Sequence, residues 1–357
     1  MSFIRRHFSL LLAILAIAAL SDCGNHRVGH VAYVSLAGAN KVAGYKIDSS
    51  GKLSAIQGSP FSGGSTPESV YIHPSKKFVY VANQSGGDIS LFTVDSGSGA
   101  LMESSSRTAA GTNPTALAMD SNGKFLFVAN SGSSDISVYS INTSSGALTP
   151  ATGSPFPTGP KPIALTLASN KFLYVTNANA ASVSAYSISS SSGQLTQITG
   201  SPFAVGTDPY SIAGDPGGHF LYVVNLVSGT ISAFSIDSTS GSLSSIATYS
   251  AGTNPISVAV DKSGKYAYVA NSGSSNISAF SIDSTSGTLT EISGSPFGAG
   301  STPVFAVIDV SGKFLYVGDQ TSIIYGFSIK SSTGALSGAA GSPFSVGSAP
   351  SSMSTIQ

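Results

Sequence analysis

Four polar side chains lie beside prolines that open short apolar runs, and their types could do chemistry. They are Glu68, Lys161, Asp208 and Tyr210. A carboxylate such as Glu68 can act as a general base, and Tyr210 or Lys161 can stabilise charge that develops on a carbonyl oxygen. The same groups can instead bind a ligand, and Lys161 and Asp208 can form a surface ion pair that contributes ~0–1 kcal/mol. We therefore treat Glu68 and Tyr210 as candidates for catalysis and all four residues as candidates for ligand binding.

The other polar residues do not complete a catalytic centre. Gln84 and Gln320, in turns expected on the same side as Glu68, are further candidates for ligand binding. His73 lies five strand residues from Glu68, which corresponds to roughly 17 Å at ~3.3 Å per residue and excludes a hydrogen bond between them. No nucleophile–base–orienter triad is visible. A loop with one carboxylate, such as that of Asp88, supplies too few ligands for calcium, so we expect neither a metal nor a cofactor.

A repeated unit must position these residues. Its clearest copy, residues 124–141, reads KFLFVANSGSSDISVYSI, two apolar runs joined by a small polar turn. The residue that closes the first run recurs every 46–48 residues, at Leu36, Asn83, Asn130, Asn177, Asn225, Asn271 and Asp319. A fixed period of this length with several short strands is typical of a β-propeller. Seven copies therefore predict an all-β, seven-bladed propeller with four-stranded antiparallel blades. We expect each asparagine to bond the backbone of the turn that it begins.

Within one repeat, the sequence predicts strands at residues 256–260, 266–270, 277–282 and 289–292, the last short and polar. The motif GSPF follows this fourth strand in five repeats and is missing from the second and the fifth. The first repeat lacks a proline-led strand, while residues 349–356 match residues 113–119. We therefore expect the C-terminal strand to complete the first blade as its innermost strand, which removes the open edges of the ring.

Composition and charge narrow the possible functions. Charged residues make up 9% of the chain, against about 25% in average proteins, and the formal net charge is zero. This balance gives no electrostatic basis for binding nucleic acid or an anionic membrane. The single cysteine, Cys23, precedes the predicted propeller, residues 30–357, which therefore has no disulfide. We expect a monomer.

The N-terminal residues indicate export. Arg5 and Arg6 precede an apolar stretch of 11 residues, which fits a signal peptide and is too short for a stable membrane span. Residues 20–23, Leu-Ser-Asp-Cys, resemble a bacterial lipobox, although Asp22 stands where a small residue is expected. We interpret residues 1–22 as a signal peptide, Cys23 as a lipidation site and residues 23–29 as a tether. The resemblance implies an outer-membrane lipoprotein, and an ordinary cleaved signal would instead give a periplasmic or extracellular protein.

The motifs FLYVTN at residues 172–177 and YVAN at residues 80–83 resemble YVTN-type propeller repeats and the seven-bladed lactonase family, which includes bacterial 6-phosphogluconolactonase. This resemblance implies the propeller fold and, as an activity, lactone hydrolysis. The family carries His, Arg and Glu just after the prolines, where the strands enter the channel. At six of these places this chain has no basic residue: Thr115-Ala116, Ile163-Ala164, Tyr210-Ser211, Ile256-Ser257, Val304-Phe305 and Ser351-Ser352.

Two functions therefore stay open. In the first, the protein is an exported, non-enzymatic scaffold of the cell envelope that binds a protein or glycan partner at the channel mouth and touches the membrane only through its lipid anchor. In the second, it is a lactone hydrolase of the 6-phosphogluconolactonase-like family. Missing channel cations make an oxyanion hard to stabilise and favour the scaffold. An apolar, plugged channel mouth would favour the scaffold as well.

Replacing Cys23 with Ser should release the protein from the membrane fraction, because the thiol that would carry the lipid is lost. The tether is short, at most ~20 Å at ~3.3–3.6 Å per residue, so the lipidated protein should remain close to the bilayer. Fractionation of cells that express each form measures the effect, and mass spectrometry checks that the signal is still cleaved. A cleaved Cys23→Ser protein that stays with the membrane would rule out this anchor.

Overall fold

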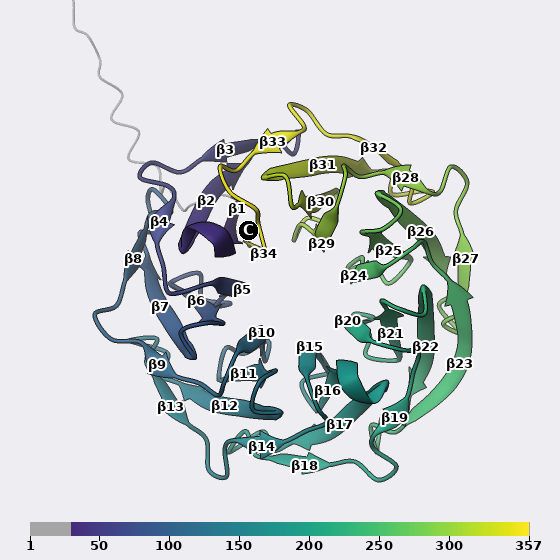
Figure 1. The fold of residues 1–357 in the computed structure, drawn as a ribbon, viewed down its shortest axis with the longest axis horizontal. Helices are drawn as coiled ribbons and strands as arrows, with labels where there is room; N and C mark the ends of the chain where they lie inside the picture. The colour runs from purple at the N-terminus through teal and green to yellow at the C-terminus, as the bar shows by residue number, and fades with distance from the viewer. Residues whose placement is uncertain (1–29, 357) are drawn as a thin grey trace, which may run out of the picture.

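The computed structural model describes residues 30–356 and shows seven β-sheets around a central channel (Figure 1). Each sheet is one blade of four antiparallel strand positions. The predicted all-β, seven-bladed propeller is confirmed. The predicted signal peptide, the lipidation site Cys23 and the tether lie outside the described residues. Among residues 30–356, no helix is long and apolar enough to cross a membrane.

The strands occupy four positions from the channel to the rim. The innermost strands, for blades 1 to 7, are β34 (Ser352–Ile356), β5 (Pro67–Ile72), β10 (Pro114–Met119), β15 (Pro162–Ala168), β20 (Pro209–Gly214), β24 (Pro255–Val260) and β29 (Pro303–Ile308). The second strands are β1 (Val31–Leu36), β6 (Phe78–Asn83), β11 (Phe125–Asn130), β16 (Phe172–Asn177), β21 (Phe220–Asn225), β25 (Tyr266–Asn271) and β30 (Phe314–Asp319). The third strands are β2 (Lys41–Ile47), β7 (Asp88–Val94), β12 (Asp135–Ile141), β17 (Ser182–Ile188), β22 (Thr230–Ile236), β26 (Asn276–Ile282) and β31 (Ile323–Ile329). Two short 3-10 helices, η1 (Ala37–Ala39) and η2 (Ala178–Ala180), follow β1 and β16.

The outer edge of six blades consists of two short strands, where the sequence predicted one. These pairs are β3 (Leu53–Ala55) with β4 (Phe61–Ser62), β8 (Leu101–Glu103) with β9 (Thr108–Ala109), β13 (Leu148–Pro150) with β14 (Phe156–Pro157), β18 (Leu195–Gln197) with β19 (Phe203–Ala204), β27 (Leu289–Glu291) with β28 (Phe297–Gly298), and β32 (Leu336–Gly338) with β33 (Phe344–Ser345). Blade 5 has one continuous outer strand, β23 (Leu243–Ser250).

The GSPF motif fills the break between the two outer strands. In all five copies the serine hydroxyl accepts a hydrogen bond of 2.8–3.0 Å from a backbone N–H of the third strand. The serines are Ser59, Ser154, Ser201, Ser295 and Ser342. The hydroxyl thus satisfies a donor that the broken strand leaves without a carbonyl partner.

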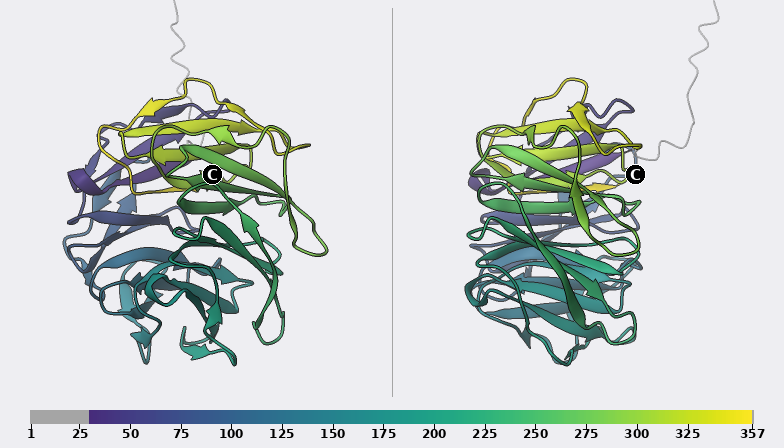
Figure 2. Two further views of the ribbon diagram at one scale, coloured as in Figure 1. Left: turned by 45° about the vertical axis from the view of Figure 1, so that its right-hand side comes forward. Right: turned by 90° about the vertical axis from the view of Figure 1, so that its right-hand side faces the viewer.

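The C-terminal strand closes the ring as predicted. β34 pairs with β1 from Val31 opposite Ile356 to Ser35 opposite Ser352. The Ser351 hydroxyl also lies 2.9 Å from the Ser35 hydroxyl and donates to the carbonyl of Pro67 in blade 2 at 2.7 Å. Because Val31 is paired with Ile356, the described chain begins and ends at the same face of the disc, which Figure 2 shows edge-on.

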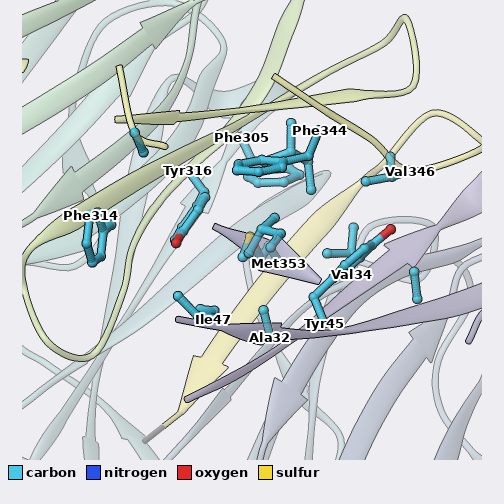
Figure 3. Close-up of a cluster of buried hydrophobic side chains, with 14 of the residues drawn as sticks. Ala32, Val34, Tyr45, Ile47, Phe305, Phe314, Tyr316, Phe344, Val346 and Met353 are labelled. Carbon is cyan, nitrogen blue, oxygen red and sulfur yellow. The ribbon is translucent and has the colours of Figure 1, made fainter. Parts of the chain in front are cut away.

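The hydrophobic cores lie between the blades. Seven clusters of buried side chains are present, and each combines residues of two neighbouring blades. Between blades 7 and 1, Phe305 and Tyr316 pack with Val34, Tyr45 and Met353 (Figure 3). A blade therefore buries its two faces only by stacking against both neighbours.

The residue that ends the second strand fixes the turns at one face. Asn83 donates from Nδ2 to Asp88 at 2.6 Å and to Ser90 at 2.9 Å, both on β7. Asn130 also accepts the backbone N–H of Gly111, in the loop that arrives from the preceding blade, at 3.2 Å. The expectation that the asparagines mainly bond the backbone of their own turn is therefore wrong: their side chains join two strands, and those of Asn130, Asn177 and Asn271 also bond an incoming loop. Two blades have another residue at the position of the asparagine. In blade 7 it is Asp319, which accepts two backbone N–H groups, and in blade 1 it is Leu36, which is apolar.

A buried tyrosine links each blade to the next, with one exception. The phenol donates to a glycine carbonyl of the following blade at 2.7–2.9 Å, in the pairs Tyr33–Gly99, Tyr80–Gly146, Tyr174–Gly241, Tyr222–Gly287, Tyr268–Gly334 and Tyr316–Gly51. Five of these glycines also lie against an aromatic ring of the preceding blade: a Cβ on Gly287 would lie 2.3 Å from Phe220. Between blades 3 and 4 Phe127 has the position of the tyrosine in the repeat, and Gly193, which lies against the ring of Phe125, has that of the glycine.

The tyrosine bonds predict opposite effects of two substitutions. Tyr222→Phe should lower the free energy of unfolding by about 1–3 kcal/mol, because the buried Gly287 carbonyl loses its donor. Phe127→Tyr should raise the free energy of unfolding by about 0.5–1.5 kcal/mol, because the new phenol would supply the missing donor to the carbonyl of Gly193. Urea unfolding followed by circular dichroism measures both, and each variant serves as the control for the other. An unchanged transition in Tyr222→Phe would show that these bonds do not hold the blades together.

Candidate functional site

The first residues of the innermost strands surround one mouth of the channel, which we call the site face. Six of these strands begin at a proline. A cavity of about 360 Å³ opens at this mouth. It is lined by Glu68, Ser69, Gln84, Thr115, Ser131, Lys161, Ile163, Ala164, Tyr210, Ser211, Ile256, Ser257, Val304, Ser351 and Ser352.

Four of the six predicted site residues come together there. Glu68, Gln84, Lys161 and Tyr210 line the cavity, whereas Asp208 and Gln320 do not. The mouth is also neither plugged nor purely apolar, because aliphatic side chains from blades 4, 6 and 7 line it together with the polar ones. This mixed lining is suited to a ligand rather than to a closed scaffold.

Glu68 is the carboxyl group of the cavity. It is the second residue of β5 and is partly buried. Its side chain forms no hydrogen bond or salt bridge with the described residues, and burial raises the pKa of its carboxyl above the usual 4.5. A nearby cation would counteract that shift, so the raised pKa indicates a carboxyl without an ionic partner.

Tyr210 supplies a phenol from β20 of blade 5, on another side of the channel from Glu68. Burial raises the pKa of this phenol, and the negative charges of Glu68 and Asp208 raise it further. At neutral pH Tyr210 is therefore a protonated donor that faces a carboxyl group across the cavity. Asp208 acts on the site only through its charge.

Lys161 is the one cation of the cavity lining. It precedes Pro162, is exposed, and has a left-handed backbone, with φ of 56°. The ion pair between Lys161 and Asp208 that the sequence suggested is not formed: the salt bridges of residues 30–356 are His30–Asp309, Arg107–Glu103 and His219–Asp215. Lys161 therefore stays free to meet a ligand or solvent.

The serines of the cavity are occupied by structural hydrogen bonds. In four blades the second residue after the proline is a serine whose hydroxyl accepts a backbone N–H from the innermost strand of the next blade. The acceptor and donor residues are Ser352 and Val70, Ser69 and Leu117, Ser211 and Val258, and Ser257 and Ala306. Sequence reasoning missed this role, although serine at the same distance from a proline in four strands was a signal for it. These hydroxyls brace the channel and are poor candidates for a nucleophile.

The histidines lie away from the site, as the strand length predicted. His73 follows β5 at the opposite face, is buried, and its Nε2 lies 2.9 Å from the carbonyl oxygen of Gly123 in blade 3. His219 also lies at this opposite face, where its Nδ1 is 3.5 Å from Oδ2 of Asp215. Within residues 30–356, no three His, Cys, Asp or Glu side chains are grouped so that they could hold a metal ion.

The sequence model of the family described as "Lactonase, 7-bladed beta-propeller" matches residues 26–167, 157–260 and 257–351. The chain belongs to this family. Among solved structures it is similar to a Bacteroides fragilis protein provisionally described as a 6-phosphogluconolactonase, with 23% identity over 94% of this chain and 100% of that chain and a TM-score of 0.80.

Two further structures are similar to this lactonase-family propeller. One, from Bacteroides uniformis, also carries a provisional description as a 6-phosphogluconolactonase and has 19% identity over 92% of this chain and 99% of that chain, with a TM-score of 0.80. The other is the Pseudomonas aeruginosa periplasmic gluconolactonase, with 19% identity, the same coverage and a TM-score of 0.76. At these identities the likeness concerns the fold. No curated protein matches the chain.

The raised pKa of Glu68 predicts a pH-dependent stability difference in this lactonase-family propeller. The folded protein binds the Glu68 proton more tightly than the unfolded chain, so this contribution to stability is complete below the ordinary carboxyl pKa of 4.5 and is lost as the pH rises through the raised value. Glu68→Gln, which is neutral throughout, should melt at a higher temperature than the wild type at pH 7 and at nearly the same temperature near pH 4.

Thermal melts at the two pH values measure this difference. Glu291→Gln, at an exposed position of β27, is the control for a general loss of one negative charge. A Glu68→Gln shift that is equal at both pH values would contradict the raised pKa.

Proposed function

We propose that this lactonase-family propeller is an exported, monomeric cell-envelope protein that binds a neutral hydroxylated ligand, a sugar or the end of a glycan, without hydrolysing it. The composition of the cavity is the observation that carries the proposal. The fifteen described residues of its lining offer an amide, a phenol, a carboxyl and an ammonium group, but neither Arg nor His.

The lining suits a sugar. Gln84, Glu68 and Tyr210 can donate to or accept from hydroxyl groups. Ile163, Ile256 and Val304 add apolar side chains that can pack against the C–H surface of a ring. A mostly apolar pocket with a few convergent polar groups is the usual form of a small-molecule site.

The charge of the site face disfavours an anionic ligand such as a phosphorylated lactone. The carboxylates at this face belong to Glu68, Asp88, Asp135, Asp208 and Asp319, and the ammonium groups to Lys41 and Lys161, a formal balance of −3. The turns of the opposite face carry nine lysines and eight aspartates, a formal balance of +1: the lysines are at positions 52, 76, 77, 124, 171, 262, 265, 313 and 330, and the aspartates at positions 48, 95, 120, 215, 237, 261, 283 and 309. The zero net charge of the sequence conceals this asymmetry, which lowers the local concentration of anions at the cavity.

Hydrolysis would require donors for the negative charge that develops on the lactone carbonyl oxygen. Loss of one such donor typically costs ~100–1,000-fold in rate. Lys161 is the only cation of the lining, and the remaining donors, which are Tyr210, Gln84 and the serine and threonine hydroxyls, are uncharged. Binding without turnover is the function that these groups support best.

The course of the chain is consistent with an N-terminal anchor. His30, the first described residue, precedes β1 and lies 3.9 Å from Asp309, in the turn between β29 and β30. That turn belongs to the face opposite the cavity. A lipid at Cys23 would therefore attach the disc by its far face and leave the cavity directed away from the bilayer.

A lactone assay and a binding assay on the purified protein test the proposal together. Hydrolysis of 6-phosphogluconolactone and of gluconolactone, followed in a pH-stat, should not exceed the spontaneous rate. Titration calorimetry with neutral mono- and oligosaccharides should show binding that Glu68→Gln changes and Glu291→Gln does not. Absence of binding to every sugar would refute the proposed ligand class.

Lactone hydrolysis is the second candidate, and the pairing of Glu68 with Tyr210 favours it. A carboxyl with a raised pKa that shares a cavity with a phenol can supply general acid–base catalysis. Clear turnover that Glu68→Gln abolishes while ligand binding persists would establish this function in place of the first.

A further inference from the structure

A second cavity lies beside the first on the site face, at the junction of blades 2 and 3. It has a volume of about 330 Å³ and is lined by Ser133 and by residues 84–87 and 110–113. Residues 84–87 form the turn between β6 and β7, and residues 110–113 form the loop that leads from β9 to β10. We call it the junction groove.

The junction groove lies next to the channel cavity. Gln84 lines both of them. The turn between β11 and β12 also borders both, since Ser131 lines the channel cavity and Ser133 lines the groove. A ligand seated at the channel mouth can therefore extend outward past Gln84 towards the rim of the disc.

The lining of the groove is uncharged. Its side chains are the amides of Gln84 and Asn113 and the hydroxyls of Ser85, Thr112 and Ser133, together with Ala110 and three glycines. Such a lining offers no cation for a phosphate or carboxylate, but it offers donors and acceptors for hydroxyl groups. The chemistry therefore matches a neutral polyhydroxylated chain.

An extended peptide fits this groove less well. A peptide that adds a strand needs free backbone donors along an edge. Here Ala110 donates its N–H to Gly87 at 2.9 Å, Gly111 to Asn130 at 3.2 Å and Thr112 to Ser133 at 3.1 Å. The backbone of the loop is thus already bonded, and recognition falls to side chains.

The junction of blades 5 and 6 is a natural comparison. Residues 251–255 repeat the sequence AGTNP of residues 110–114, and Thr253 donates its N–H to Ser274 as Thr112 does to Ser133. The neighbouring turn, however, carries Leu226 and Val227 where blade 2 has Gln84 and Ser85, and Val227 is 66% exposed. The difference in polarity between the two junctions therefore comes from the turn of blade 2.

We propose that the channel cavity and the junction groove form one cleft that binds a linear neutral oligosaccharide, with one end at the channel mouth and the following units over blades 2 and 3. This inference rests on the proposed function and adds to it the ligand's length and direction. A glycan chain, rather than a single sugar, is the ligand class that the joined cavities accommodate.

Titration calorimetry with chitin, cello- and malto-oligosaccharides of one to six units tests the inference on the full-length protein. For the series that binds, the tetramer should bind at least about tenfold more tightly than the monomer. Thr112→Trp should fill the groove and remove that gain without changing the affinity for the monomer. Thr253→Trp, at the matched position of blades 5 and 6, should leave both affinities unchanged.

The outcomes separate this inference from the function on which it rests. Monomer binding with no gain in affinity for longer chains, or equal effects of Thr112→Trp and Thr253→Trp, would overturn the cleft and leave the channel-mouth site intact. Absence of binding to all three series would overturn both. Binding of an extended polar peptide in place of any oligosaccharide would assign the cleft to a protein partner and likewise overturn the inference.

Discussion

The distance between neighbouring blades is the constraint on which the whole ring depends, and the tyrosine–glycine bonds set it. Burial raises the pKa of these phenols, so that they remain donors at any ordinary pH. Because most of the acceptor glycines also lie against an aromatic ring of the preceding blade, a side chain there would push the two blades apart. The bond from Tyr316 to Gly51 and the pairing of β34 with β1 complete the ring, and only then is every apolar blade face covered.

The period of the sequence predicted this frame because a blade is a local unit whose strands and turns follow one another directly. The residue that closes each second strand marked the period correctly, and the match between residues 349–356 and residues 113–119 predicted the closing strand. The partners of the asparagines could not be read in the same way. Asn130 bonds Gly111, which arrives from another blade, and such a contact depends on how blades are stacked rather than on the turn that the asparagine begins. The break in the outer strand was hidden for a similar reason, since the role of the GSPF serine appears only when the third strand lies beside it.

The location of the candidate site residues was predictable where it follows from the direction of the innermost strands. Residues beside the prolines had to lie at one mouth of the channel, and this placed Glu68, Lys161 and Tyr210 correctly. Asp208 has the same left-handed backbone before a proline as Lys161, yet it does not line the cavity. The same backbone conformation before a proline therefore does not decide whether a side chain lines the cavity. The bracing serines and the junction groove were missed because both arise between blades, whereas the sequence was read one repeat at a time.

Glu68 has no ionic partner among residues 30–356, and this bears on the class of ligand that we propose for the mouth. A carboxyl group that burial deprives of water has a raised pKa, and in its ionised form it accepts hydrogen bonds from hydroxyl groups. Those conditions suit a neutral sugar, while an oxyanion would find little compensating charge. The innermost strands are already fixed to one another through Ser69, Ser211 and Ser257. A ligand of the proposed class would therefore meet strands that are already ordered, so that its binding would cost little conformational entropy.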